Sequence, residues 1–181
     1  MILKNFEINK INYLKNKFIL FYGKNEGLKN IKIKEIISKK KEDKIFKYDE
    51  KQILENTEEF YDNMLNGSLF DNNKLIIINR SSEKILPAID YLSGKYLDGI
   101  TFIIKSDILE KKSKLRSIFE KNKDYVCIPF YPDTNETLIK VAQNFFSSIK
   151  ITISSQNLNL IVNKCNGDRE YLNNELRKIS L

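Results

Sequence analysis

A glycine-bounded loop lies early in the chain, where Gly23-Lys24-Asn25-Glu26-Gly27 follows the apolar run 18–22. A helical pattern begins after it, and a strand, a glycine loop and a helix form the layout of a phosphate-binding site. The working pattern is G-x-x-x-x-G-K-[ST], because its lysine contacts the terminal phosphates and its hydroxyl holds magnesium. Here the second glycine comes one residue early, and Leu28-Lys29 follow it. The loop with Gly23, Lys24 and Gly27 is therefore predicted to be a degenerate phosphate loop, and a residual anion site near Gly27 stays open.

The end of a second apolar run also lacks the chemistry of a nucleotide hydrolase. The run 74–79 ends in Asn79-Arg80, where an NTPase places an acidic metal ligand. Glu55, Glu58 and Glu59 share one helical pattern and are interpreted as a solvated face rather than a catalytic pair. Because two independent requirements fail, we expect no catalytic residue, no cofactor and no nucleotide hydrolysis.

The chain contains no histidine and only two cysteines, Cys127 and Cys165. Catalysis by an imidazole is therefore excluded. Two distant cysteines without a CxxC spacing also argue against a zinc site, and no metal is expected. Both are predicted to be buried free thiols in a reducing compartment. Since there is no signal peptide and no run of 18 apolar residues, we expect a cytoplasmic protein that does not contact a membrane.

The basic excess is concentrated near the N-terminus. The chain has 31 Lys and Arg against 24 Asp and Glu, a net charge of +7, and residues 1–50 hold 13 of the lysines. Only four basic residues are arginines, the side chain that bidentate recognition of phosphates and bases favours. A solvated lysine surface is the interpretation that we favour, and a nucleic-acid-binding module is the alternative.

Short apolar runs alternate with helical patterns over the first 132 residues. Strands are expected at 18–22, 44–48, 74–79, 100–104 and 125–128, and helices at 28–40, 50–65, 85–92 and 112–121. Strands that alternate with helices predict a parallel sheet with right-handed crossovers. The expected fold class is therefore α/β, with a five-stranded parallel sheet and helices on both faces.

The pattern changes after Pro132, where three helical patterns follow without a strand between them. Thr134 is the expected N-cap of the first helix, Gly167 ends the second, and Asp168 caps the third. We therefore expect two domains, 1–132 and a small helical domain at 133–181. The last pattern is still apolar at Leu181, which we interpret as a truncation.

The connection between the helical pattern 50–65 and the run 74–79 carries large apolar residues. It contains Ser68-Leu69-Phe70, preceded by Met64 and Leu65. A short connection is normally polar, so these side chains either pack into the core or contact another protein. Both possibilities remain open from the residues alone.

Four segments together resemble the delta subunit of the bacterial DNA polymerase III clamp loader. They are FILFYG at 18–23, Ser68-Leu69-Phe70 ahead of 74–79, LEKKSKLRSIF at 109–119, and GDREYLNNELRKI at 167–179. Each motif is loose, but their order and spacing cover nearly the whole chain. This resemblance implies an AAA+-like domain without a working nucleotide site, a three-helix lid, and a C-terminal collar domain that this chain lacks.

The resemblance also implies a function and partners. Delta subunits bind the ring-shaped sliding clamp, beta, and open it for loading on DNA, and the gripping residues match Leu69 and Phe70. Ser68, Met64 and Leu65 would support them. The full-length protein would assemble with ATPase subunits and delta-prime, with DNA as a member of the complex. This chain would itself catalyse nothing, although it would belong to a DNA-directed DNA polymerase holoenzyme, a nucleotidyltransferase.

Overall fold

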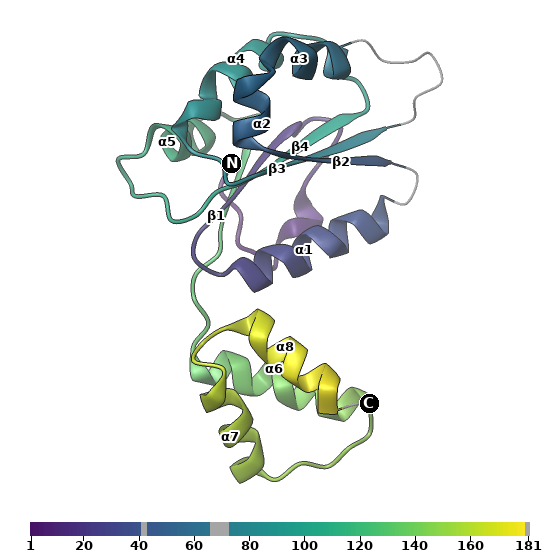
Figure 1. Ribbon diagram of the computed structural model, residues 1–181, viewed down its shortest axis with the longest axis vertical. Helices are drawn as coiled ribbons and strands as arrows, with labels where there is room; N and C mark the ends of the chain where they lie inside the picture. Colours follow the sequence, from purple (N-terminus) through teal and green to yellow (C-terminus); the bar gives the residue numbers. More distant parts are fainter. Residues whose placement is uncertain (41–42, 66–72, 180–181) are drawn as a thin grey trace. The chain divides into compact units, whose positions relative to one another are not determined.

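The computed structural model describes residues 1–40, 43–65 and 73–179 (Figure 1). The chain divides into two compact units. The first, which we call the sheet unit, comprises residues 1–23 and 32–129, and the second, the lid unit, comprises residues 24–31 and 130–181. The grouping of the short segment 24–31 with the helical part was not expected from the sequence, which suggested a single boundary after residue 132.

Five parallel strands form one sheet with the order β2-β3-β4-β1-β5. The strands are β1 (Phe18–Tyr22), β2 (Lys44–Asp49), β3 (Lys74–Asn79), β4 (Ile100–Lys105) and β5 (Val126–Pro129). The predicted five-stranded parallel α/β fold is confirmed. The central strands could be predicted from the sequence, because a strand that is covered on both faces appears as a continuous apolar run.

The helices of the sheet unit follow the predicted alternation, with one exception. They are η1 (Ile8–Lys10), α1 (Glu26–Lys39), α2 (Glu50–Glu55), α3 (Thr57–Leu65), η2 (Glu83–Ile85), α4 (Leu86–Ser93) and α5 (Lys114–Lys121), with the first turn of α1 belonging to the lid unit. The prediction of a single helix at 50–65 was wrong. Two helices, α2 and α3, cover this range, because Asn56 between them leaves the helical conformation at φ −132° and ψ 54°. Asparagine favours such a break because its side chain competes for backbone hydrogen bonds.

The core of the sheet unit lies between the sheet and the helices α2 to α5. Alternate residues of β1, namely Phe18, Leu20 and Tyr22, belong to this core, and the Phe18 ring stacks on Phe102 at 4.9 Å. The intervening residues Ile19 and Phe21 are also fully buried. Figure 1 shows α1 on the opposite side of the sheet from α2, α3 and α4. The expectation of helices on both faces is therefore confirmed.

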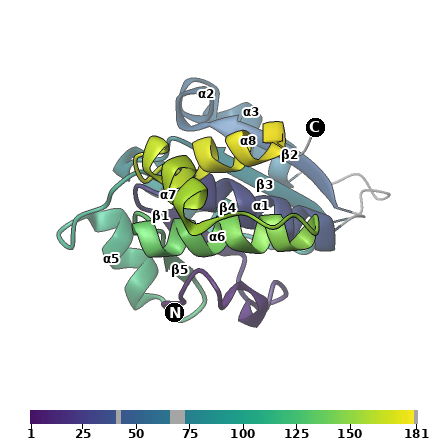
Figure 2. The same ribbon diagram turned by 90° about the horizontal axis from the view of Figure 1, so that it is seen from below.

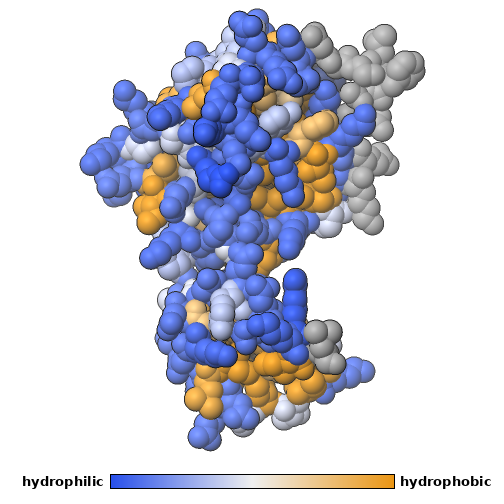
Figure 3. All heavy atoms as spheres, in the orientation of Figure 1, coloured by the Kyte–Doolittle hydropathy of each residue, from blue (hydrophilic) through white to orange (hydrophobic). Residues whose placement is uncertain are grey.

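Besides the start of α1, the described part of the lid unit contains three helices, each of which contacts the other two (Figure 2). They are α6 (Asn135–Ser148), α7 (Ser155–Lys164) and α8 (Arg169–Ile179). The predicted cap Thr134 accepts a hydrogen bond from the Thr137 amide, and Asp168 accepts from the amides of Glu170 and Tyr171. The buried core is Leu138, Ala142, Phe146, Leu158, Val162, Cys165, Leu172 and Leu176. Partly buried apolar residues surround it, and apolar atoms gather on the face of this unit drawn in Figure 3.

The two cysteines are free and buried, as predicted. Burial raises the pKa of the Cys127 thiol to about 12. Among the described residues, no cluster of His, Cys, Asp or Glu has the arrangement of a metal site. Within the same ranges, no helix has both the length and the apolar character needed to cross a bilayer.

Candidate functional site

The loop after β1 keeps the turn of a phosphate loop but uses it differently. Gly23 has a φ of 121°, which an L residue rarely adopts, and its amide donates to the Asp107 carbonyl at 3.0 Å. Asn25 caps α1 by accepting a hydrogen bond from the Leu28 amide at 3.0 Å. Lys24 is exposed. The cap therefore already satisfies one of the amides that a phosphate loop would offer to a ligand.

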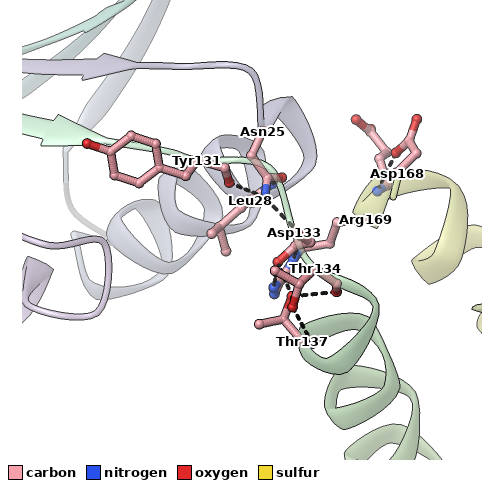
Figure 4. Close-up of polar contacts among 9 residues, drawn as sticks. Asn25, Leu28, Tyr131, Asp133, Thr134, Thr137, Asp168 and Arg169 are labelled. Carbon is pink, nitrogen blue, oxygen red and sulfur yellow. Dashed lines mark hydrogen bonds and ion pairs between the residues drawn. The ribbon is translucent and has the colours of Figure 1, made fainter. Parts of the chain in front are cut away.

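A carboxylate lies at the N-terminal end of α1. Asp133 accepts a hydrogen bond from the Asn25 amide nitrogen at 2.8 Å and another from the Thr137 hydroxyl at 3.1 Å. The Arg169 guanidinium binds both carboxylate oxygens, with Nε 2.6 Å from Oδ2 (Figure 4). We call Asn25, Asp133, Thr137 and Arg169 the clasp.

The ion pair at the centre of the clasp is nearly closed to solvent, whereas Thr137 is exposed. The Asp133 side chain is 5% exposed and that of Arg169 is 15% exposed. Burial raises the pKa of Asp133, but the hydrogen bonds from Arg169, Asn25 and Thr137 outweigh this effect and hold the pKa below its ordinary value. The side chains of Arg169, Asn25 and Thr137 therefore hold Asp133 in its charged form.

Gly27 has a packing role that the sequence did not reveal. A Cβ atom at this position would lie 2.7 Å from the backbone nitrogen of Glu170 and 3.0 Å from its Cβ. The first turns of α1 and α8 therefore approach closely, and the Asn30 side chain adds a hydrogen bond to Glu170 at 3.4 Å. Gly27 is required by this approach, whatever else the loop does.

The end of β3 carries a basic group where a nucleotide hydrolase has an acidic one. Arg80 forms an ion pair with Asp49 at the end of the neighbouring strand β2. A hollow of about 760 Å³ lies at this edge, lined by residues 80–83 and by 107–114 except Lys111. Glu83 in its wall accepts the Lys114 amide at 2.7 Å, so a carboxylate of the chain already occupies the N-terminus of α5. Asn79-Arg80 thus offers no metal ligand of the expected kind.

The predicted partner-binding residues Ser68, Leu69 and Phe70 lie outside the described residues. Met64 is 3% exposed and belongs to the core of the sheet unit, and Leu65 packs against that core. Their contribution to a partner contact stays a prediction. The Lys74 ammonium, at the start of β3, donates to the Asn63 carbonyl in the last turn of α3 at 3.2 Å.

Sequence reasoning missed the clasp. Asn25 and Asp133 are 108 residues apart in the sequence, and Asp133 and Arg169 are 36 residues apart. One weak signal was present, because Asp133 and Arg169 each lie next to a predicted helix cap. Arginine is also rare in this chain, with only four copies.

The strand order and the three following helices define the class of fold: it is an α/β fold with a five-stranded parallel sheet followed by three helices. No known family profile matches the chain, and no curated protein matches it in sequence. Among solved structures, it is similar to the Bacillus subtilis DNA clamp loader delta protein YqeN, with a TM-score of 0.59 and 15% identity. That match covers 96% of this chain and 56% of the delta protein.

Two further structures share the fold. Domain III of the Thermotoga maritima replication initiation protein DnaA matches with a TM-score of 0.55 and 14% identity, over 93% of this chain and 76% of that one. The Thermotoga maritima RuvB Holliday junction branch migration motor matches with a TM-score of 0.56 and 14% identity, over 91% and 54%. The chain therefore spans little more than half the length of YqeN and of RuvB.

Proposed function

We propose that this chain is a clamp-loader subunit of the delta type, which binds a sliding clamp and opens the ring for loading on DNA during replication. The fold supports this proposal, because it is similar to that of the clamp loader delta protein over 96% of the chain, and DnaA and RuvB share it at similar TM-scores. The four sequence segments that resemble delta subunits add to it, because they are spread over the same length.

The proposed contact is the segment with Ser68, Leu69 and Phe70. Burying a leucine and a phenylalanine in a partner is worth about 1.5–3 kcal/mol each, and such apolar anchors usually dominate an interface. Ring opening then requires only that the subunit fits the opened clamp better than the closed one.

The proposed subunit hydrolyses no nucleotide. Two observations support this part: Asp133 lies at the N-terminal end of α1, and Arg80 replaces an acidic metal ligand. Contacts with ATPase subunits, delta-prime and DNA, and a cytoplasmic location, belong to the same proposal. They are part of the proposal because this chain covers only 56% of the delta protein.

The alternative is a nucleic-acid-binding or nucleotide-binding domain without a clamp contact. The lysines of residues 1–50 are the feature that would favour DNA binding. Several of them are already paired with carboxylates: Lys10 with Glu7, Lys15 with Asp124, Lys29 with Glu26, Lys32 with Glu35 and Lys40 with Asp43. Such pairing reduces the charge available to a phosphate backbone, so this alternative is less favoured.

Surface plasmon resonance with an immobilised bacterial sliding clamp tests the proposal directly. We expect saturable binding of the folded chain to the clamp, and weak, nonspecific binding to duplex DNA. Steeply salt-dependent DNA binding without any clamp binding would favour the alternative.

A further inference from the structure

The starts of three helices of the lid unit each supply a side chain that donates to one carboxylate. The helices α1 and α6 start after the caps Asn25 and Thr134, and α8 starts after Asp168. The N-terminus of a helix carries unpaired amides and a partial positive charge, so it favours an anion. Figure 4 shows Asp133 lying between these three starts. The caps already pair the first amides, so the carboxylate acts on the helix starts through their side chains and through the partial positive charge.

Asp133 supplies that charge and uses both of its oxygens. Oδ2 accepts from Asn25 at 2.8 Å and from Arg169 at 2.6 Å, while Oδ1 accepts from Thr137 and from the second arginine nitrogen. These donors come from the cap of α1, the first turn of α6 and the first residue of α8. A phosphate at this position would meet a buried carboxylate of like charge.

A phosphate loop normally obtains its anion from a bound nucleotide, which then links the loop to its surroundings. We propose that Asp133 is a resident anion that replaces such a ligand and permanently joins the first turns of α1, α6 and α8. The order of the lid unit is then independent of nucleotide. This inference does not rest on clamp binding, so failure of one leaves the other standing.

Chemical rescue tests the resident anion. In Asp133→Ala, the amides of residues 26–30 and 170–172 should exchange hydrogen roughly tenfold faster or more, since a buried pair has been broken. Inorganic phosphate or formate, at ionic strength matched with sodium chloride, should restore slow exchange in this variant and leave the unmodified chain unchanged. Glu175→Ala is the matched control, because Glu175 is also an ion-paired carboxylate of the lid unit but pairs with Lys164 and Lys178.

Two results would overturn the inference. One is added protection of these amides in the unmodified chain on addition of Mg-ATP or pyrophosphate, because it would reveal an open anion site. The other is exchange in Asp133→Ala that equals the exchange in Glu175→Ala. If Asp133→Ala does not fold, Asp133→Asn keeps the shape and removes the charge: faster exchange in this variant supports the inference, and unchanged exchange refutes it.

Discussion

Gly27 and Glu170 bring the first turns of α1 and α8 into backbone contact, although the two residues are 143 positions apart in the sequence. A Cβ atom on residue 27 would lie only 2.7 Å from the Glu170 nitrogen. Because the obstructing atom is backbone and cannot rotate away, the two helices would have to separate.

Gly27→Ala should therefore destabilise the lid unit by about 1–3 kcal/mol, a cost that exceeds the helix propensity gained from alanine. Urea unfolding monitored by circular dichroism measures the change. Gly94→Ala is the control, because a Cβ there meets only the Tyr91 carbonyl, at 3.8 Å. A Gly27→Ala chain as stable as Gly94→Ala would contradict the close approach.

Acid should weaken the lid unit through Asp133. The pKa of Asp133 is lower in the folded chain than its unfolded value of about 3.9, because the hydrogen bonds from Arg169, Asn25 and Thr137 outweigh the opposing effect of burial. Its contribution is therefore fully present above the unfolded pKa and is lost as the pH falls through the folded pKa. Unfolding free energies measured from pH 7 to pH 2 should fall less steeply below pH 4 in Asp133→Asn than in the unmodified chain. Parallel curves would show that Asp133 does not contribute.

Replacing both proposed anchors, Leu69→Ala with Phe70→Ala, should weaken clamp binding about 100-fold or more, since two buried side chains are lost from the interface. Thermal stability should stay nearly unchanged. Leu160→Ala is the control, because this leucine is 64% exposed on α7 and takes no part in the proposed contact. A large loss of stability in the double variant would show that the pair belongs to the core.

Both thiols should resist alkylation in the folded chain. Burial raises the pKa of Cys127 to about 12 and also raises that of Cys165, so little reactive thiolate forms at neutral pH. Iodoacetamide at pH 8 should label neither cysteine until denaturant is added, as mass spectrometry can verify. Rapid labelling of the native chain would show that one of the two environments opens readily.

Most of the fold could be predicted because its signals are local. The apolar runs of β1 and β3 and the caps Thr134 and Asp168 each depend on a few neighbouring residues. The break at Asn56 was missed, because the apolar spacing on both sides of it continues in a helical register. Nothing in that spacing indicates that one helix ends and another begins at this residue.

The candidate site was less accessible to prediction. The defects of the phosphate loop could be predicted, since the absence of the Lys-Ser/Thr pair can be read directly from the sequence. The clasp at the N-terminal end of α1 was not visible in the sequence, because Asp133 and Arg169 are brought to Asn25 only by the folded chain. The proposed anchors Leu69 and Phe70 are known from sequence alone.

The clasp also has a consequence for the order in which the chain folds during synthesis. Asn25 and Gly27 leave the ribosome more than a hundred residues before their partners Asp133 and Glu170. The first turn of α1 must therefore wait for distant contacts, and closing so long a loop carries a large entropic cost. We expect the sheet to form first and the helical part to be completed last, after α8 has emerged. A fragment that begins at residue 130 would lack residues 24–31, the part of the lid unit that is synthesised first.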